Sequence, residues 1–225
     1  MNNYALLVCV FILGAPVYAS EPSVEELERW FESDDTAPPK TDNVNEGKLV
    51  FLSKIPDKRI PTVINNITIT ENSLLTGWVT INQCYQDLDP ISAVEIVYRY
   101  RQMRNLKIKS SKNIHSVRLE GNSVQLNEVN PGAGLCVNLQ AQILYLSNES
   151  KFELRNGPFE RKFLDGYYPL YVQLKIQYPS KKIVFITSEP HASPGFIIRE
   201  DTNQLIIDTW FEGKLTTKLI FRLKD

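Results

Sequence analysis

The sequence predicts an all-β protein built from antiparallel sheets as one large or two small sandwiches, and three observations support this fold class. From Lys48 onward, apolar and polar residues alternate with the period of two that is typical of half-buried strands. Turn-forming residues interrupt this alternation roughly every eight to twelve positions, and no long helical pattern occurs in this part of the chain. With 225 residues, of which 43% are hydrophobic and 23% charged, the chain has an ordinary globular composition.

The first nineteen residues are typical of a signal peptide. Residues 5–17 form an uncharged, mostly apolar run, which is shorter than the roughly 20 residues that a membrane-spanning helix needs. Val17 and Ala19 place small residues at the −3 and −1 positions of a cleavage site. We therefore expect cleavage after Ala19, export to the periplasm or cell exterior, and no transmembrane span after cleavage. A retained anchor is the alternative.

Residues 20–46 are expected to form an acidic helix and linker arm in front of an all-β domain, residues 47–225. Ser23 and Glu26 make a capping-box pair for a short helix, and Pro38-Pro39 lies in the linker that follows. Nine acidic and two basic residues over 21–46 give this arm a net charge of −7, although the whole chain has a net charge of −1.

The domain contains 23 of the 25 basic residues and 17 of the 26 acidic residues, so its net charge is +6. Near-neutrality of the whole chain predicts no nucleic-acid partner, while the basic domain is compatible with an anionic polymer. A further boundary inside the domain is expected, if anywhere, near residues 128–133.

The strands follow one another along the domain in short segments. We expect 94–99 and 106–109 to form a hairpin, and Pro131-Gly132-Ala133-Gly134 to form the turn before a long strand over 135–145. The other expected strands are 49–52, 67–70, 78–81, 116–120, 123–127, 171–178, 183–187, 196–199, 205–208 and 215–222.

Cys84 and Cys136 are the two cysteines that remain after removal of Cys9 with the signal peptide. In an oxidising compartment two cysteines allow one pairing. A disulfide that closes a loop of roughly 50 residues contributes about 4 kcal/mol by chain entropy. The alternative, a catalytic thiol or metal site, requires a nearby histidine, and neither His115 nor His191 has ligand-like spacing to a cysteine. We expect a structural disulfide, no metal and no cofactor.

A basic run between Glu95 and Glu120 is the first candidate binding surface. It contains no acidic residue, and its cations are Arg99, Arg101, Arg104, Lys107, Lys109 and Lys112. Strand alternation and the protection of sheet edges by lysine explain such a run without a ligand. The alternative is a strip that binds phosphates, glycan carboxylates or the acidic arm.

The segment 155–169 is the stronger candidate, because a long loop rich in aromatic residues is uncommon unless it is packed or functional. We expect at most two helical turns over 159–165. Phe159, Phe163 and Leu164 would close the end of the sandwich in a structural interpretation. In the functional one, the ligand-binding residues are Arg155, Phe159, Arg161, Lys162, Tyr167 and Tyr168, with the cations forming a rim around the two tyrosines.

No motif in the sequence specifies a reaction. Nucleophile elbows, zinc-protease motifs and phosphate-binding loops are absent. We therefore expect an exported soluble binding or structural module of the cell envelope, whose partner is an envelope glycan, an anionic polymer or another envelope protein. The alternative is a hydrolase that acts on an envelope polymer through carboxylates brought together by the fold.

Overall fold

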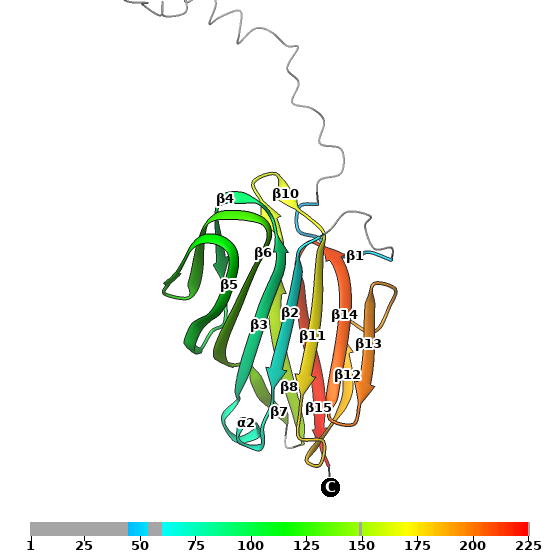
Figure 1. Cartoon of the computed structure of the whole chain (residues 1–225). Coiled ribbons are helices and arrows are strands. Elements are labelled where there is room, and N and C mark those ends of the chain that lie inside the picture. Colours follow the sequence, from blue (N-terminus) through cyan, green and yellow to red (C-terminus); the bar gives the residue numbers. More distant parts are fainter. Residues whose placement is uncertain (1–44, 54–59, 149, 225) are drawn as a thin grey trace, which may run out of the picture. The chain divides into compact units, whose positions relative to one another are not determined.

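Strands make up 72% of the part of the chain that the structure describes, and helix makes up 3%. The computed structural model describes residues 45–53, 60–148 and 150–224 (Figure 1). The predicted signal peptide, and the predicted arm as far as residue 44, lie outside the described residues. The strands form antiparallel sheets packed as a sandwich, which confirms the predicted fold class. Among these residues no helix is long and apolar enough to cross a membrane.

Two sheets and one small hairpin contain all the described strands. The large sheet has the order β1-β14-β11-β2-β3-β6-β4, with β13 beside β14 and β5 beside β6. Its strands are β1 (Val50–Phe51), β2 (Thr62–Thr68), β3 (Trp78–Leu88), β4 (Ile91–Val97), β5 (Met103–Glu120), β6 (Ser123–Gln142), β11 (Leu170–Gln177), β13 (Phe196–Asp201) and β14 (Gln204–Glu212).

The small sheet has the order β12-β15-β8-β7. Its strands are β7 (Leu144–Asn148), β8 (Lys151–Phe159), β12 (Ile183–Glu189) and β15 (Leu215–Leu223), and the hairpin consists of β9 (Lys162–Phe163) and β10 (Gly166–Tyr167). Among the described pairs, β2 with β11 is parallel and the others are antiparallel.

Alternating side chains of both sheets build one apolar core. In β11, Val172, Leu174 and Ile176 have no exposed surface, while the residues between them are partly exposed. Leu139 of the large sheet and Leu154 of the small sheet are also fully buried in this core. Burial of each such side chain stabilises the folded state by roughly 1.5–3 kcal/mol. The alternation read from the sequence therefore specifies which face of each strand is buried.

A short helix, α2 (Glu71–Thr76), joins β2 to β3 and was not expected from the sequence. Thr70 caps its first turn, with a capping box formed by Thr70 and Ser73. The helix ends at Gly77, which has a φ of 75°. A Cβ atom at this glycine would meet the Leu144 carbonyl oxygen at 2.7 Å, so residue 77 needs both the left-handed conformation and the missing side chain.

The expected hairpin between 94–99 and 106–109 is wrong. β4 and β5 both pair with β6 and lie on its opposite edges, so that Asn127 of β6 is paired with Ala93 of β4 and with Ser116 of β5. The expected turn at 131–134 is wrong too, because β6 continues through it. Residues 128–133 therefore lie inside a single strand.

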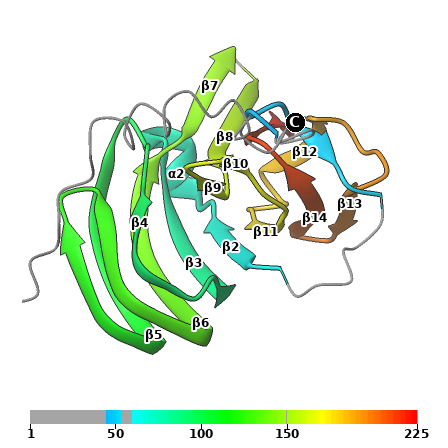
Figure 2. The same cartoon turned by 90° about the horizontal axis from the view of Figure 1, so that it is seen from above.

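Irregularities at one level of three neighbouring strands bend the large sheet. Asp87 in β3, Asn113 in β5 and Glu128 in β6 have φ values of 53°, 55° and 51°, and the registers of β3 and β5 against β6 shift beside the first two. Such bulges bend a strand and increase its twist. We call the part beyond the bend the tip: β4, residues 114–120 and residues 123–129. The strong curvature of β5 and β6 is visible in Figures 1 and 2.

The predicted disulfide joins Cys84 of β3 to Cys136 of β6, with 4.1 Å between their Cα atoms. The two cysteines are directly opposite in the register. Two residue pairs separate them from the bulge between Gln86 and Leu88. The disulfide therefore holds β3 and β6 together just before the tip begins.

Candidate functional site

A cleft of about 360 Å³ lies between the tip and the small sheet. One wall is the continuous segment 94–100, which comprises the end of β4 and the residues after it. The opposite wall is the continuous segment 157–163, which runs from the end of β8 into β9. The remaining lining residues are Val63 of β2, Gln83, Tyr85 and Leu88 of β3, and Pro61, Asp89 and Leu170. β4 and β10 lie at the same end of the sandwich, where the bend brings the two walls together (Figure 1).

Three tyrosines, Tyr85, Tyr98 and Tyr100, line the cleft. The hydroxyl oxygens of Tyr85 and Tyr98 are 3.4 Å apart, and the Tyr100 hydroxyl donates to Asn156 Oδ1 at 3.0 Å. Loss of water around the buried Tyr98 raises its pKa to about 12, and burial also raises the pKa values of Tyr85 and Tyr100. At neutral pH all three are therefore uncharged hydroxyl groups that can donate and accept hydrogen bonds.

Buried amide groups without hydrogen-bond partners lie at and beside the base of the cleft. Gln83 is 4% exposed and lines the cleft, and its Oε1 has no partner among the described residues. Asn65, directly opposite Gln83 on β2, lacks a partner within the described residues for either side-chain atom, and Asn156 lacks one for Nδ2. Each buried group of this kind costs about 1–3 kcal/mol when unpaired. Gln83 is the one among these three that the cleft reaches.

Two ion pairs bridge the cleft from the segment 157–163, one to the connection between β3 and β4 and one to the segment 94–100. Arg161 donates from Nε to Asp89 Oδ2 at 2.8 Å and from Nη2 to Asp89 Oδ1 at 2.5 Å. Glu160, the preceding residue, binds Arg99 with 3.1 Å between Oε1 and Nη1. Lys162 and Glu95 add one charge of each sign, so the charged side chains that line the cleft balance. The arrangement favours an uncharged ligand over an anionic one.

The structure places only part of the predicted site in the cleft. Phe159, Arg161 and Lys162 line it together with Arg99 from the basic run. The expected helical turns over 159–165 are wrong, because these residues belong to β8, β9 and the connections around them. Phe159 is buried in the core as the structural interpretation requires, whereas Leu164 is fully exposed and closes nothing.

Tyr167 and Tyr168 lie outside the cleft lining. Tyr167 is 7% exposed and has the Lys162 and Lys214 amino groups over its ring at 5.6 and 5.4 Å. The Tyr168 hydroxyl donates to Asp165, and the guanidinium of Arg161 lies 5.4 Å from its ring. Lys162 and Arg161, two of the three predicted rim cations, therefore do contact these rings, although Asp89 neutralises Arg161.

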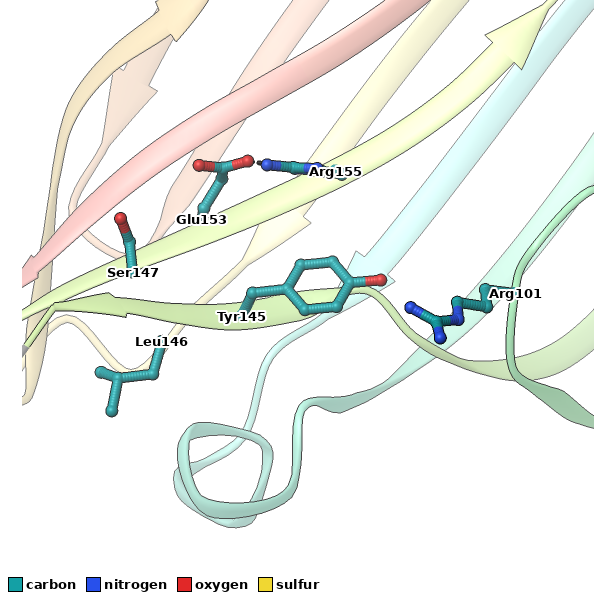
Figure 3. A pocket seen from close by; sticks show the side chains of 6 residues that line it. All are labelled: Arg101, Tyr145, Leu146, Ser147, Glu153 and Arg155. Atoms are coloured by element: carbon teal, nitrogen blue, oxygen red, sulfur yellow. Dashed lines mark hydrogen bonds and ion pairs between the residues drawn. The ribbon is translucent and has the colours of Figure 1, made fainter.

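Arg155 and Arg101 meet in a second pocket, which is more open and has a volume of about 400 Å³. Arg155 forms an ion pair with Glu153 and lies 5.8 Å from the ring of Tyr145. Figure 3 shows the Arg101 guanidinium directed toward the hydroxyl end of Tyr145. This pocket joins one residue of each predicted binding segment.

The rest of the basic run lies on β5 and does not continue either pocket. Arg104 lies over the ring of Trp78 at 4.1 Å and donates to Gln140. Lys107 and Lys109 are exposed on β5, which pairs with β6 alone among the described strands and is an edge of the large sheet. The run is therefore divided among three places, and its central part suits the protection of an edge strand.

Sequence reasoning missed Gln83 and the three tyrosines. Gln83 occupies an inward position of β3, between the buried Ile81 and the cleft-lining Tyr85. A polar residue at an inward position of an apolar alternation is the pattern that marks it. The tyrosines could not be grouped from the sequence, because Tyr85 precedes the bend and the other two follow it.

Comparison of the chain with protein-family models, curated proteins and solved structures found no match. Within the described ranges, no cluster of three or more His, Cys, Asp or Glu side chains is arranged to hold a metal ion. The functional interpretation therefore depends on the chemistry of the cleft.

Proposed function

We propose that the protein is an exported binding module of the periplasm or cell envelope, and that the cleft between residues 94–100 and 157–163 is its ligand site. One observation carries the proposal. The cleft reaches Gln83, whose buried Oε1 has no hydrogen-bond partner among the described residues. A ligand that donates to this oxygen would recover a cost of about 1–3 kcal/mol.

The chemistry of the lining also indicates which class of ligand fits the cleft. Clefts of about 300–1,000 Å³ with apolar walls and a few convergent polar groups are typical ligand sites. Here the polar groups include amide and phenol, and four of the six ionised groups are paired, as Arg161 with Asp89 and Arg99 with Glu160. Of the expected partners, an uncharged glycan or a segment of another envelope protein fits this chemistry better than an anionic polymer.

A binding comparison of two variants tests the site. Gln83→Leu removes the amide and keeps an apolar side chain, and Lys107→Ala is the matched control on exposed β5. The probes are a panel of neutral oligosaccharides and a library of random peptides displayed on phage. We expect Gln83→Leu to weaken the selected ligands about tenfold or more, as one hydrogen-bonded buried group accounts for roughly that factor, and Lys107→Ala to leave them unchanged.

Ligands that bind Gln83→Leu and the wild type equally would remove the cleft as the site. Failure of both probe classes to bind the folded wild type would count against the binding function itself. Unfolding curves of both variants establish that the comparison concerns folded protein.

The hydrolase alternative has less support from the cleft. Hydrolysis of a glycan requires one carboxyl group to donate a proton while a second acts on the sugar or on water. Asp89 accepts two hydrogen bonds from Arg161, and Glu160 is held by Arg99. Both carboxylates thus have an arginine partner, while Glu160 Oε2 has no hydrogen-bond partner among the described residues. Release of reducing ends from envelope glycan by the wild type, lost in Asp89→Asn and Glu160→Gln, would reverse this preference.

A further inference from the structure

β4 presents an unpaired backbone edge to the cleft. Among the described strands β4 pairs only with β6, through the register Ala93 with Asn127 to Val97 with Ser123. Residues 94–100 line the cleft consecutively, as expected where the backbone edge of a strand, and not one face, forms the wall. A row of backbone donors and acceptors is therefore available on the side away from β6.

The hydrogen bonds of Tyr98 show which residues supply that row. Its N–H donates to the Asn122 carbonyl at 3.0 Å, and its carbonyl accepts from Asn122 Nδ2 at 2.9 Å. Tyr98 thus directs its backbone groups to the β6 side. Alternate residues of an antiparallel strand direct these groups to the same side. Ile96 therefore also points to β6, while Glu95 and Val97 point to the cleft.

The free edges of β5 and β4 differ in their protection along the two strands. β5 has the cations Arg104, Lys107, Lys109, Lys112 and Arg118 along its length, which block pairing with other chains. β4 has the sequence Ile-Ser-Ala-Val-Glu-Ile-Val, with no Lys, Arg or Pro and with Val97 44% exposed. An unprotected edge rich in β-branched residues is suited to accept another strand.

We propose that the cleft binds an extended, mainly uncharged segment of a partner protein, which adds to the large sheet as a strand along the free edge of β4. This inference rests on the proposed function and names its ligand class. Strand addition takes its affinity from backbone hydrogen bonds and its selectivity from pockets for alternate side chains. The edge of Glu95 and Val97 supplies the hydrogen bonds, and the tyrosines and Phe159 supply the apolar lining.

Two substitutions of one residue separate backbone pairing from side-chain recognition. Glu95→Pro removes an N–H that faces the cleft and leaves the bonds between β4 and β6 in place, while Glu95→Gln keeps the N–H and removes only the charge. The probes are peptides selected from the phage library on the full-length chain. We expect Glu95→Pro to weaken them about tenfold or more and Glu95→Gln to change affinity less than about twofold, because the backbone bond is lost only in the former.

N-methylated versions of a selected peptide provide the same test without changing the protein. One version is methylated on the odd-numbered amides of the peptide and the other on the even-numbered amides. The version whose methylated amides face β4 should not bind, whereas the other version should bind with little loss. Equal effects in both versions, or equal effects of the two Glu95 variants, would overturn strand addition.

Other outcomes distinguish this inference from the proposed function. Neutral oligosaccharides that bind in a Gln83-dependent way, while no peptide is selected, would overturn strand addition and leave the cleft as a ligand site. Selected peptides that are indifferent to Gln83→Leu and Glu95→Pro would overturn both. A dimer in solution that Glu95→Pro dissociates would identify a second copy of this chain as the strand donor and would also overturn a partner segment.

Discussion

Gln83 of β3 and Asn65 of β2 are directly opposite each other on the buried face of the large sheet, where Asn65 Oδ1 and Nδ2 and Gln83 Oε1 lack hydrogen-bond partners among the described residues. Buried amide atoms without hydrogen bonds lower the stability of the folded state. Because the cleft reaches Gln83 and the lining does not include Asn65, the two residues should respond differently in binding and alike in stability.

Asn65→Leu and Gln83→Leu should each raise the free energy of unfolding, by about 1–3 kcal/mol, because each removes an unpaired buried amide from the core. Urea unfolding measures both changes. Only Gln83→Leu should reduce ligand binding. Lower stability in both variants would mean that each amide is satisfied in solution, and would weaken the argument for the cleft.

Alkaline pH should destabilise the protein through the cleft tyrosines. The pKa of Tyr98 is about 12 in the folded state and about 10 in an unfolded chain. The folded state therefore holds this proton more tightly, and the resulting stability is complete below pH 10 and is lost as the pH rises from about 10 to 12. The shift corresponds to roughly 2–3 kcal/mol.

Unfolding free energies measured across this pH range test the prediction. Tyr98→Phe should reduce the alkaline decline, because it removes the hydroxyl group whose pKa is raised. A wild-type profile that is flat up to pH 12 would show that the Tyr98 hydroxyl is solvated.

The pair of Arg161 and Asp89 should fix the width of the cleft. A double-mutant cycle with Arg161→Lys and Asp89→Asn should give a coupling of about 0.5–1.5 kcal/mol, since the side chains are 20% and 31% exposed and water screens them. Lysine keeps the charge but cannot make two parallel bonds. Arg161→Lys should therefore also weaken peptide or glycan binding, and 1 M salt should reduce the coupling. A coupling near zero would assign Arg161 to the rings of Phe163 and Tyr168 instead.

Loss of the disulfide should destabilise the bend. The double variant Cys84→Ala, Cys136→Ala should unfold with a free energy about 2–4 kcal/mol below that of the wild type. Denaturation followed by tryptophan fluorescence measures this difference. Mass measurement after alkylation, with and without reductant, provides the independent check. Free thiols at both cysteines in exported protein would contradict the disulfide.

Local patterns in the sequence predicted the fold class, the buried faces and the disulfide. The alternation around Leu174 and Ile176 identifies inward positions without knowledge of any partner strand, because the side chains of a strand point to opposite faces in turn. The two remaining cysteines allow a single pairing. These properties depend on neighbours in the chain or on counting, so the sequence alone determines them.

Only the tertiary structure decided which strands pair and what meets in the cleft. β4 and β5 show similar alternation, yet each pairs with β6, since strand pairing depends on the packing of the whole core and on the bend at Asp87, Asn113 and Glu128. The cleft unites residues from β2, β3, β4 and the end of β8, and no local pattern relates them. The ion pairs of the cleft arise the same way, because Arg99 and Arg161 are far in the sequence from Glu160 and Asp89 and meet them only in the folded chain.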